Sequence, residues 1–216
     1  MTTRIIDALV DPAVALAAAA LELRSGGVVI LPTDTVYGLT ALASDGAAVG
    51  DLFERKGRSA DRRVAVLVAD ADQAQQVVTA GQAFSLLAGA LWPGPLTIVC
   101  DRADGFGPWL GEGGATVGVR CPDHDLVRAL AAEVGPIATT SANRAGEPTP
   151  ADAAGAASAV GGDLLVLDGG PCAGRPSTVL DLTAEPARIL RLGAVSAAQI
   201  RRVGVATAAE TEPGAR

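Results

Sequence analysis

The chain has 216 residues, of which 49% are hydrophobic and 19% charged, and its net charge is −7 at pH 7. This length and composition fit one globular domain with a sizeable core and exclude an intrinsically disordered protein. The acidic balance argues against broad electrostatic binding to nucleic acid or to an anionic membrane, but it leaves room for a local basic pocket.

The compartment is indicated by what the sequence lacks. The apolar runs are too short or too interrupted to span a bilayer, and Asp7 and Asp11 interrupt the start, where a signal peptide needs an apolar stretch. Cys100, Cys121 and Cys172 are odd in number and far apart. Reduced thiols in a cytoplasmic protein are the simplest interpretation, with no metal site and no membrane contact.

The first half of the chain predicts a mixture of helices and strands. Asp11 and Pro12 begin an Ala- and Leu-rich helix, which Gly26 and Gly27 end. In chain order, we expect a helix at residues 11–24, a strand at 28–32, a loop at 33–40, a helix at 46–56, a strand at 63–69, and helices at 71–79 and 83–91. The helix at 46–56 delivers Lys56 near its C-terminus.

The second half is richer in strands. Beyond Pro93, we expect strands at residues 96–100 and 116–120, a helix at 122–134, a strand at 136–140, a turn-rich loop at 141–148, strands at 164–170, 177–182 and 188–193, and a short helix at 195–203. The short connection between the last two strands favours antiparallel pairing. The sequence therefore predicts one α/β domain at residues 1–203, with a twisted mixed β-sheet flanked by helices, and a flexible tail at 204–216.

Polar clusters directly follow or precede several expected strands, where α/β folds build ligand sites. They are rich in hydroxyls, amides and cations and poor in nucleophile–base pairs. Such a set suits an anionic ligand with several phosphate or carboxylate oxygens better than it suits acyl hydrolysis. The side chains are Thr33, Thr35, Lys56, Arg58, Arg120, Thr139, Ser141, Asn143, Ser177 and Arg191.

Each of these residues, taken alone, also has an ordinary structural explanation. Thr33 could form a turn, Ser141 could cap a loop, and Arg120 could make a surface ion pair. Lys56, the only lysine, could be the solvated end of a helix, favoured there by the helix dipole. His124, the only histidine, fits a structural role in the first turn of its helix.

Seven segments, read in order, resemble the YrdC/Sua5 family of threonylcarbamoyl-adenylate synthases. They are PTDTVYGL (32–39), KGR (56–58), WPGPLT (92–97), VGVRCPDH (117–124), TSANRAGEPTP (140–150), STVLDL (177–182) and ILRLG (189–193). The resemblance covers roughly residues 20–193. It implies a YrdC-like fold in the short, single-domain form, with a concave, positively charged cavity.

The resemblance also implies a reaction. L-Threonine and bicarbonate or CO2 form an N-carboxy-threonine, whose carboxylate attacks the α-phosphate of ATP. Pyrophosphate leaves, L-threonylcarbamoyladenylate remains, and a partner complex transfers the threonylcarbamoyl group to adenosine 37 of tRNA. Mg²⁺ is expected to enter with ATP.

Particular residues receive roles from the same resemblance. The expected catalytic residues, which neutralise the ATP phosphates, are Lys56 and Arg58. The other expected ATP-binding residues are Thr139, Ser141, Asn143 and Arg191. The expected threonine-binding residues are Thr33, Arg120 and Ser177, with the arginine holding the substrate carboxylate by a fork.

The chain departs from the family pattern after Lys56. Ser59 stands where the family usually has proline, Arg63 and Val64 stand where a Pro-Leu pair is common, and Leu67 replaces a histidine that is sometimes found there. Losing the proline is expected to loosen the loop.

Two other functions stay open at this stage. An RNA- or ribosome-binding factor would use a concave basic surface, but aromatic residues, at 3%, are scarce for stacking on bases. A carbamoyl-handling protein of hydrogenase maturation would join a YrdC-like domain to zinc-binding and acylphosphatase modules, which a chain of 216 residues does not contain.

Overall fold

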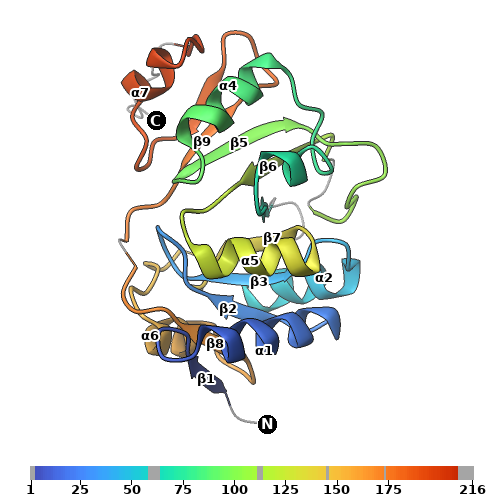
Figure 1. Cartoon of the computed structure of the whole chain (residues 1–216), viewed down its shortest axis with the longest axis vertical. Coiled ribbons are helices and arrows are strands. Elements are labelled where there is room, and N and C mark those ends of the chain that lie inside the picture. The colour runs from blue at the N-terminus through green and yellow to red at the C-terminus, as the bar shows by residue number, and fades with distance from the viewer. Residues whose placement is uncertain (1–2, 58–63, 111–113, 145, 173, 209–216) are drawn as a thin grey trace.

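The computed structural model describes residues 3–57, 64–110, 114–144, 146–172 and 174–208 (Figure 1). Within these ranges the strands are β1 (Arg4–Asp7), β2 (Val29–Leu31), β3 (Gly38–Leu42), β4 (Ala65–Leu67), β5 (Leu96–Asp101), β6 (Thr116–Arg120), β7 (Ile137–Ser141), β8 (Leu165–Asp168), β9 (Thr178–Asp181) and β10 (Arg188–Arg191). The helices are α1 (Pro12–Arg24), α2 (Gly46–Arg55), α3 (Ala71–Ala74), α4 (Gln82–Leu91), α5 (Asp125–Val134), α6 (Ala153–Val160) and α7 (Ala197–Arg202).

The strands form one twisted, mixed sheet, as predicted. Among the described residues the order is β1-β8-β2-β3-β7-β4-β6-β5-β9-β10. The sheet contains both parallel pairs (such as β4 with β6 and β5 with β9) and antiparallel pairs (such as β3 with β7 and β5 with β6). The predicted antiparallel pairing of the last two strands is confirmed by β9 and β10.

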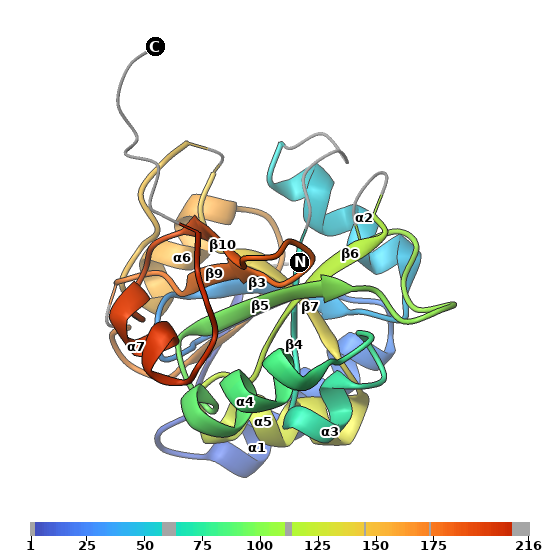
Figure 2. The same cartoon turned by 90° about the horizontal axis from the view of Figure 1, so that it is seen from above.

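Helices cover the two faces of the sheet unequally. On one face, α2, α4, α6 and α7 bury their apolar residues in a large aliphatic core. On the other face, α1 and α5 pack side by side over a smaller core near the β8 end (Figures 1 and 2). Helices therefore cover only part of the second face. The part that they leave uncovered is formed by the strands that run, in sheet order, from β3 to β10.

Several sequence-based expectations were wrong. Strand β3 begins at Gly38, inside the segment expected to be a loop, because its residues are buried between β2 and β7. The helix expected at 71–79 ends at Ala74, after which Val78 pairs with Arg102. Strand β1 and helix α6 were not predicted, since β1 is four residues long and α6 consists almost wholly of Ala, Gly and Ser without an apolar stripe.

The expected boundary of the tail also needs correction. Val205 is buried in the large core, and Ala187 exchanges backbone hydrogen bonds with Ala206 and Ala208. The packed chain therefore extends at least to Ala208, and only residues 209–216 of the expected tail lie outside the described residues. Among the residues that are described, no helix is long and apolar enough to cross a bilayer.

Candidate active site

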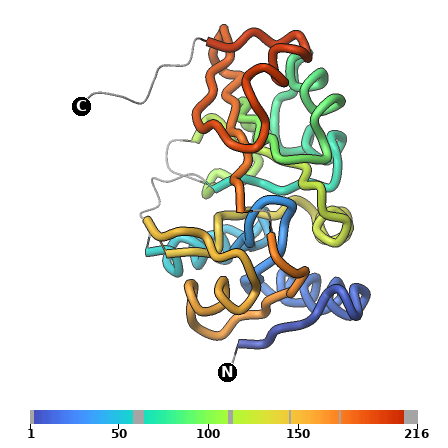
Figure 3. The backbone as a smooth tube through the Cα atoms, turned by 90° about the vertical axis from the view of Figure 1, so that its left-hand side faces the viewer, coloured from blue at the N-terminus to red at the C-terminus, as the bar shows by residue number. Residues whose placement is uncertain are grey.

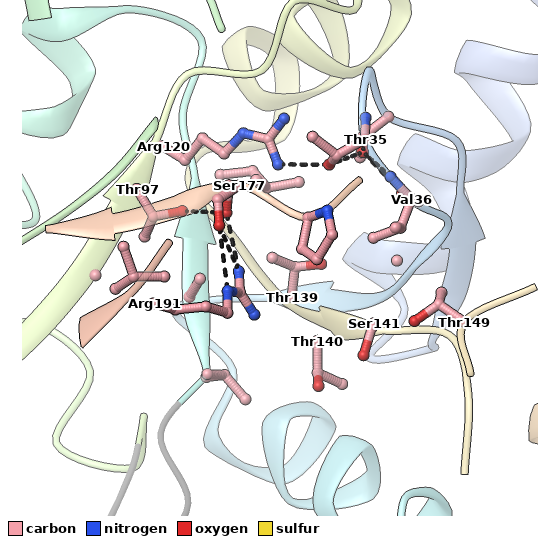
Figure 4. Close-up of a pocket in the computed structure, with 18 of the residues that line it drawn as sticks. Thr35, Val36, Thr97, Arg120, Thr139, Thr140, Ser141, Thr149, Ser177 and Arg191 are labelled. Atoms are coloured by element: carbon pink, nitrogen blue, oxygen red, sulfur yellow. Dashed lines mark hydrogen bonds between the residues drawn. The ribbon is translucent and has the colours of Figure 1, made fainter. Parts of the chain in front are cut away.

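A cavity of about 380 Å³ opens on the partly covered face of the sheet (Figure 4). Its floor is made by strands β3, β7, β4, β6, β5 and β9, and loops at the strand ends form its walls. The described residues that line it are Thr33, Thr35, Val36, Gly38, Val64, Ala65, Leu67, Thr97, Val99, Gly118, Arg120, Thr139, Thr140, Ser141, Thr149, Pro176, Ser177, Val179, Leu190 and Arg191.

The two-residue period of the strands brings the polar side chains into this cavity. On β7, Ile137 enters the core beneath α5, and the next residues on the same face, Thr139 and Ser141, line the cavity. On β6, Gly118 and Arg120 follow the same rule. A shift of one residue in β6 would replace these side chains by the core residues Val117 and Val119.

Two glycines keep the floor of the cavity low. A Cβ at Gly38 would lie 2.7 Å from Thr139 Oγ1, and a Cβ at Gly118 would lie 3.1 Å from Thr97 Cγ2. At both positions a side chain would collide with a neighbouring threonine. Because glycine has no side chain, the cavity extends down to the backbone of β3 and β6 at these two points.

The turn after β2 holds Arg120 at one end of the cavity. Thr33 Oγ1 accepts hydrogen bonds from the backbone of Thr35 and Val36, each 3.1 Å, and donates to Val36 O at 2.7 Å. Thr35 Oγ1 accepts from Arg120 Nη1 at 2.8 Å, and Asp34 pairs with Nη2. The Thr33 hydroxyl thus fixes the shape of this turn, and Asp34 and Thr35 of the turn hold Arg120.

Lys56 lies behind the cavity wall, at the C-terminal end of α2. Its ammonium group is buried and donates to the backbone oxygens of Ser141 and Asn143 and to Asn143 Oδ1, the last at 2.7 Å. Ser141 Oγ also donates to Asn143 Oδ1 at 2.6 Å. The lysine therefore fixes the loop that follows β7 and brings a positive charge next to it.

A third cluster joins three strands on the opposite side from Ser141 and Thr149 (Figure 4). Ser177 Oγ lies 2.9 Å from Thr97 Oγ1, and Arg191 donates to the Ser177 oxygens at 3.0 Å and 3.1 Å. These contacts lock the start of β9 to β5 and β10.

The cationic groups of the cavity keep their charge despite burial. Burial lowers the pKa of the Arg120 guanidinium, which Asp34 raises again, and burial alone lowers the pKa of Arg191. Arginine has so high an intrinsic pKa that both groups stay protonated at neutral pH. Among the described lining residues two are cationic and none is acidic, so the arrangement suits an anionic ligand.

Most of the residues singled out from the sequence do converge. The seven that line the cavity are Thr33, Thr35, Arg120, Thr139, Ser141, Ser177 and Arg191. Lys56 and Asn143 lie one layer behind Ser141, and Arg58 lies outside the described residues.

Sequence reasoning missed other residues of the cavity. Thr97 and Thr149 line it, and both lie within segments that had already been noted, WPGPLT and TSANRAGEPTP. Asp34 contacts Arg120 from within PTDTVYGL. A threonine next to other polar residues carries no sign of which neighbour faces a ligand, so only the fold distinguishes them.

Known proteins resemble this chain over most of its length. A family model of Sua5, YciO and YrdC proteins, described as "Telomere recombination", matches residues 22–193. A Mycobacterium leprae protein is 42% identical over 191 residues, which cover 87% of this chain and 87% of the relative. The threonylcarbamoyl-AMP synthase of Bacillus subtilis is 39% identical over 198 residues, covering 89% of this chain and 57% of the relative.

Solved structures give the same result. The crystal structure of Pyrococcus abyssi Sua5 complexed with L-threonine has a TM-score of 0.85 at 36% identity, covering 89% of this chain and 58% of that protein. The chain thus spans a little over half the length of the Bacillus and Pyrococcus proteins. Since the family model and these relatives match most of the chain, this protein belongs to the Sua5/YciO/YrdC family.

Proposed function

We propose that this chain is an L-threonylcarbamoyladenylate synthase. It uses L-threonine, bicarbonate or CO2, and ATP, and it releases pyrophosphate. The observation that carries the proposal is the convergence, in one cavity, of the Arg120 turn, the Ser141 loop backed by Lys56, and the Ser177–Arg191 cluster. The names of the Bacillus and Pyrococcus relatives support the same activity.

The cavity supplies positioning and charge rather than a nucleophile. In the proposed reaction the attacking carbamate and the ATP α-phosphate are both anionic, so their mutual repulsion opposes an in-line approach. Fixed cations and hydroxyl donors lower that barrier without a covalent enzyme intermediate. Arg120 and Arg191 line the cavity and supply two of these cations in the proposed reaction, and Lys56 adds a third positive charge from behind Ser141.

In this proposal the substrates divide the cavity. Threonine lies near Thr33, Ser177 and the guanidinium of Arg120, which binds its carboxylate. The nucleotide contacts Thr139, Ser141 and Arg191, and Lys56 and Asn143 support its phosphates from behind Ser141. Arg58, which is also expected to bind the phosphates, lies outside the described residues. Thr33 contributes by shaping the turn, because its hydroxyl is already engaged there.

Mg²⁺ is part of the nucleotide substrate in this scheme. The described lining residues include no carboxylate, and no cluster of three or more metal-binding side chains occurs in the described part of the chain. The phosphate oxygens and water would therefore supply most of the metal ligands. We further propose that the adenylate passes to a complex that modifies adenosine 37 of tRNA in the cytoplasm.

The test is pyrophosphate release from ATP with threonine or serine, each with and without bicarbonate. We expect release to require both threonine and bicarbonate, and to be slower with serine, because serine lacks the methyl group that an apolar wall can contact. Salt-dependent binding of RNA without any turnover would instead favour the RNA-binding alternative.

A further inference from the structure

The guanidinium of Arg120 is held by three contacts from two separate loops. Its Nε donates to Gly94 O at 3.0 Å, its Nη1 donates to Thr35 Oγ1 at 2.8 Å, and its Nη2 pairs with Asp34 Oδ1. Because a guanidinium is planar, three contacts on three nitrogens fix both its position and its plane. Two of its five N–H groups remain for a ligand once these contacts with described residues are made.

Asp34 differs from the other residues around this group. The cavity is lined by Thr33, Thr35 and Arg120 but not by Asp34. Its side chain is 15% exposed, against 7% for Arg120, and in the described part of the chain it is the acidic partner of that arginine. The contact that connects Asp34 with a ligand in the cavity therefore runs through the guanidinium of Arg120.

We propose that Asp34 is a positioning residue that orients the fork of Arg120 toward the carboxylate of the amino-acid substrate. The inference rests on the proposed function, because it takes Arg120 as the group that binds this carboxylate. An arginine side chain has many rotamers, and a fork that is not held in place must be ordered when the ligand binds. Asp34 orders the fork beforehand, so the substrate does not bear that cost.

A second effect of Asp34 acts in the opposite direction. Its negative charge partly neutralises Arg120 and so weakens the attraction between the guanidinium and a substrate carboxylate. If this Coulombic effect dominated, removal of the charge would strengthen binding of the amino acid. The two effects therefore predict changes of opposite sign, which makes the proposal testable.

The experiment compares Asp34→Asn, Asp34→Ala and Asp34→Glu by pyrophosphate release at varied threonine and varied ATP. Asp34→Asn and Asp34→Ala remove the same charge, but only asparagine keeps an oxygen that can accept from Nη2. We expect the KM for threonine to rise roughly tenfold in Asp34→Ala, which corresponds to about 1.4 kcal/mol, and by less than about threefold in Asp34→Asn. The KM for ATP should stay within about twofold in both.

Asp34→Glu keeps the proposal testable if the alanine variant does not fold. It retains the charge and the buried pair, but it displaces the carboxylate by one methylene. We expect a clear rise in the KM for threonine here too, with a smaller change in kcat. Asp125→Ala serves as the matched control, because it removes an aspartate from an exposed pair with Arg128, away from the cavity.

The outcomes separate this inference from the function on which it rests. Tighter threonine binding in both Asp34→Asn and Asp34→Ala, or equal losses for threonine and ATP, would overturn the positioning role. Arg120→Lys keeps the charge but loses the fork, and it should raise the KM for threonine more than that for ATP. If it does so and the Asp34 variants do not, only the positioning role fails. If it leaves threonine use unchanged, the proposed threonine subsite fails as well.

Discussion

At the scale of single residues, the polar groups of the cavity are chiefly occupied with one another. Thr33 holds its own turn, Ser177 bonds to Thr97 and Arg191, and Lys56 bonds to the loop after β7. Such networks fix donors in place before a ligand arrives, which reduces the reorganisation needed in the transition state. A residue can thus be essential here without touching the reacting atoms.

Lys56 offers the first prediction at this scale. Lys56→Met keeps most of the side-chain volume but removes the charge and the donor to Ser141 O, Asn143 O and Asn143 Oδ1. In the proposed reaction Lys56 is a preorganised charged donor beside the reacting phosphates, and such a donor is worth about two orders of magnitude, so we expect kcat/KM for ATP to fall by about that much. Steady-state pyrophosphate release at saturating threonine measures the effect.

A second variant, Lys56→Arg, separates the effect of the lost charge from the effect of a less ordered loop after β7. Lys56→Arg keeps the positive charge, so it should recover part of the ATP dependence even though its guanidinium fits the buried site less well. Equal kcat/KM for ATP in Lys56→Met and the unmodified protein would remove Lys56 from the proposed phosphate environment.

At the scale of elements, the end of β10 is pressed against the start of β9. A Cβ added at Gly193 would lie 2.3 Å from Pro176 O and 2.4 Å from Ser177 C, both backbone atoms that cannot rotate away. Thr178 Oγ1 binds the same segment by accepting from Gly193 N at 2.8 Å. The glycine of the ILRLG segment therefore serves a close approach of two backbones.

Gly193→Ala tests this contact. The added methyl group must push the two segments apart, so we expect a loss of about 1–3 kcal/mol in the free energy of unfolding. In the same variant the KM values for threonine and ATP should rise, because Ser177 and Arg191 move with these segments. Denaturant unfolding and pyrophosphate release on the same preparations provide the two measurements.

The control for this prediction is another glycine of the chain. Gly89 lies on an exposed position of α4, where an added methyl group would meet no atom within 4 Å, and alanine favours a helix. Gly89→Ala should therefore be neutral or stabilising and should leave the kinetics unchanged. A Gly193→Ala protein as stable and active as Gly89→Ala would contradict the close-approach argument.

The elements also show where sequence reasoning stops. Strands with continuous apolar runs, such as β5 and β8, and helices with marked starts, such as α1, were predicted close to their observed bounds. Strand β3 was not, because its flanking turn chemistry looked like a loop and its burial depends on two distant partners, β2 and β7. Likewise, the pairing of Asp34 with Arg120 joins residues 86 positions apart and leaves no local signature.

At the scale of the whole molecule, the cavity draws on strands from both halves of the sheet. Thr139 and Ser141 come from β7, near the β8 half, whereas Thr97 and Arg191 come from strands near the opposite edge. A ligand that contacts both sets links the halves. Ligand binding should therefore stabilise the molecule as a unit.

This leads to a prediction for thermal unfolding. At concentrations near one hundred times its Kd, a ligand that binds only the folded state adds about 2.7 kcal/mol to the free energy of unfolding. We expect threonine, and separately Mg²⁺–ATP, to raise Tm in a concentration-dependent way. Arg120→Lys should diminish the shift caused by threonine but leave that caused by ATP. Identical losses of both shifts would mean that the two ligands do not occupy separate parts of the cavity.

The connection from Asp168 to Thr178 joins strands that lie far apart in the sheet order, with six others between them, and Figure 3 shows it running from one half of the molecule to the other. Seven intervals of about 4.8 Å would separate these strands by about 34 Å in a flat sheet, whereas ten fully extended steps reach at most about 36 Å. The connection also bonds to two other segments along its way, since Cys172 N donates to Ala151 O and Gly174 N donates to Thr35 O. The connection therefore has little length to spare for a flat sheet, and the twist of the sheet, which brings distant strands closer together than a flat sheet would, allows so short a segment to join β8 to β9.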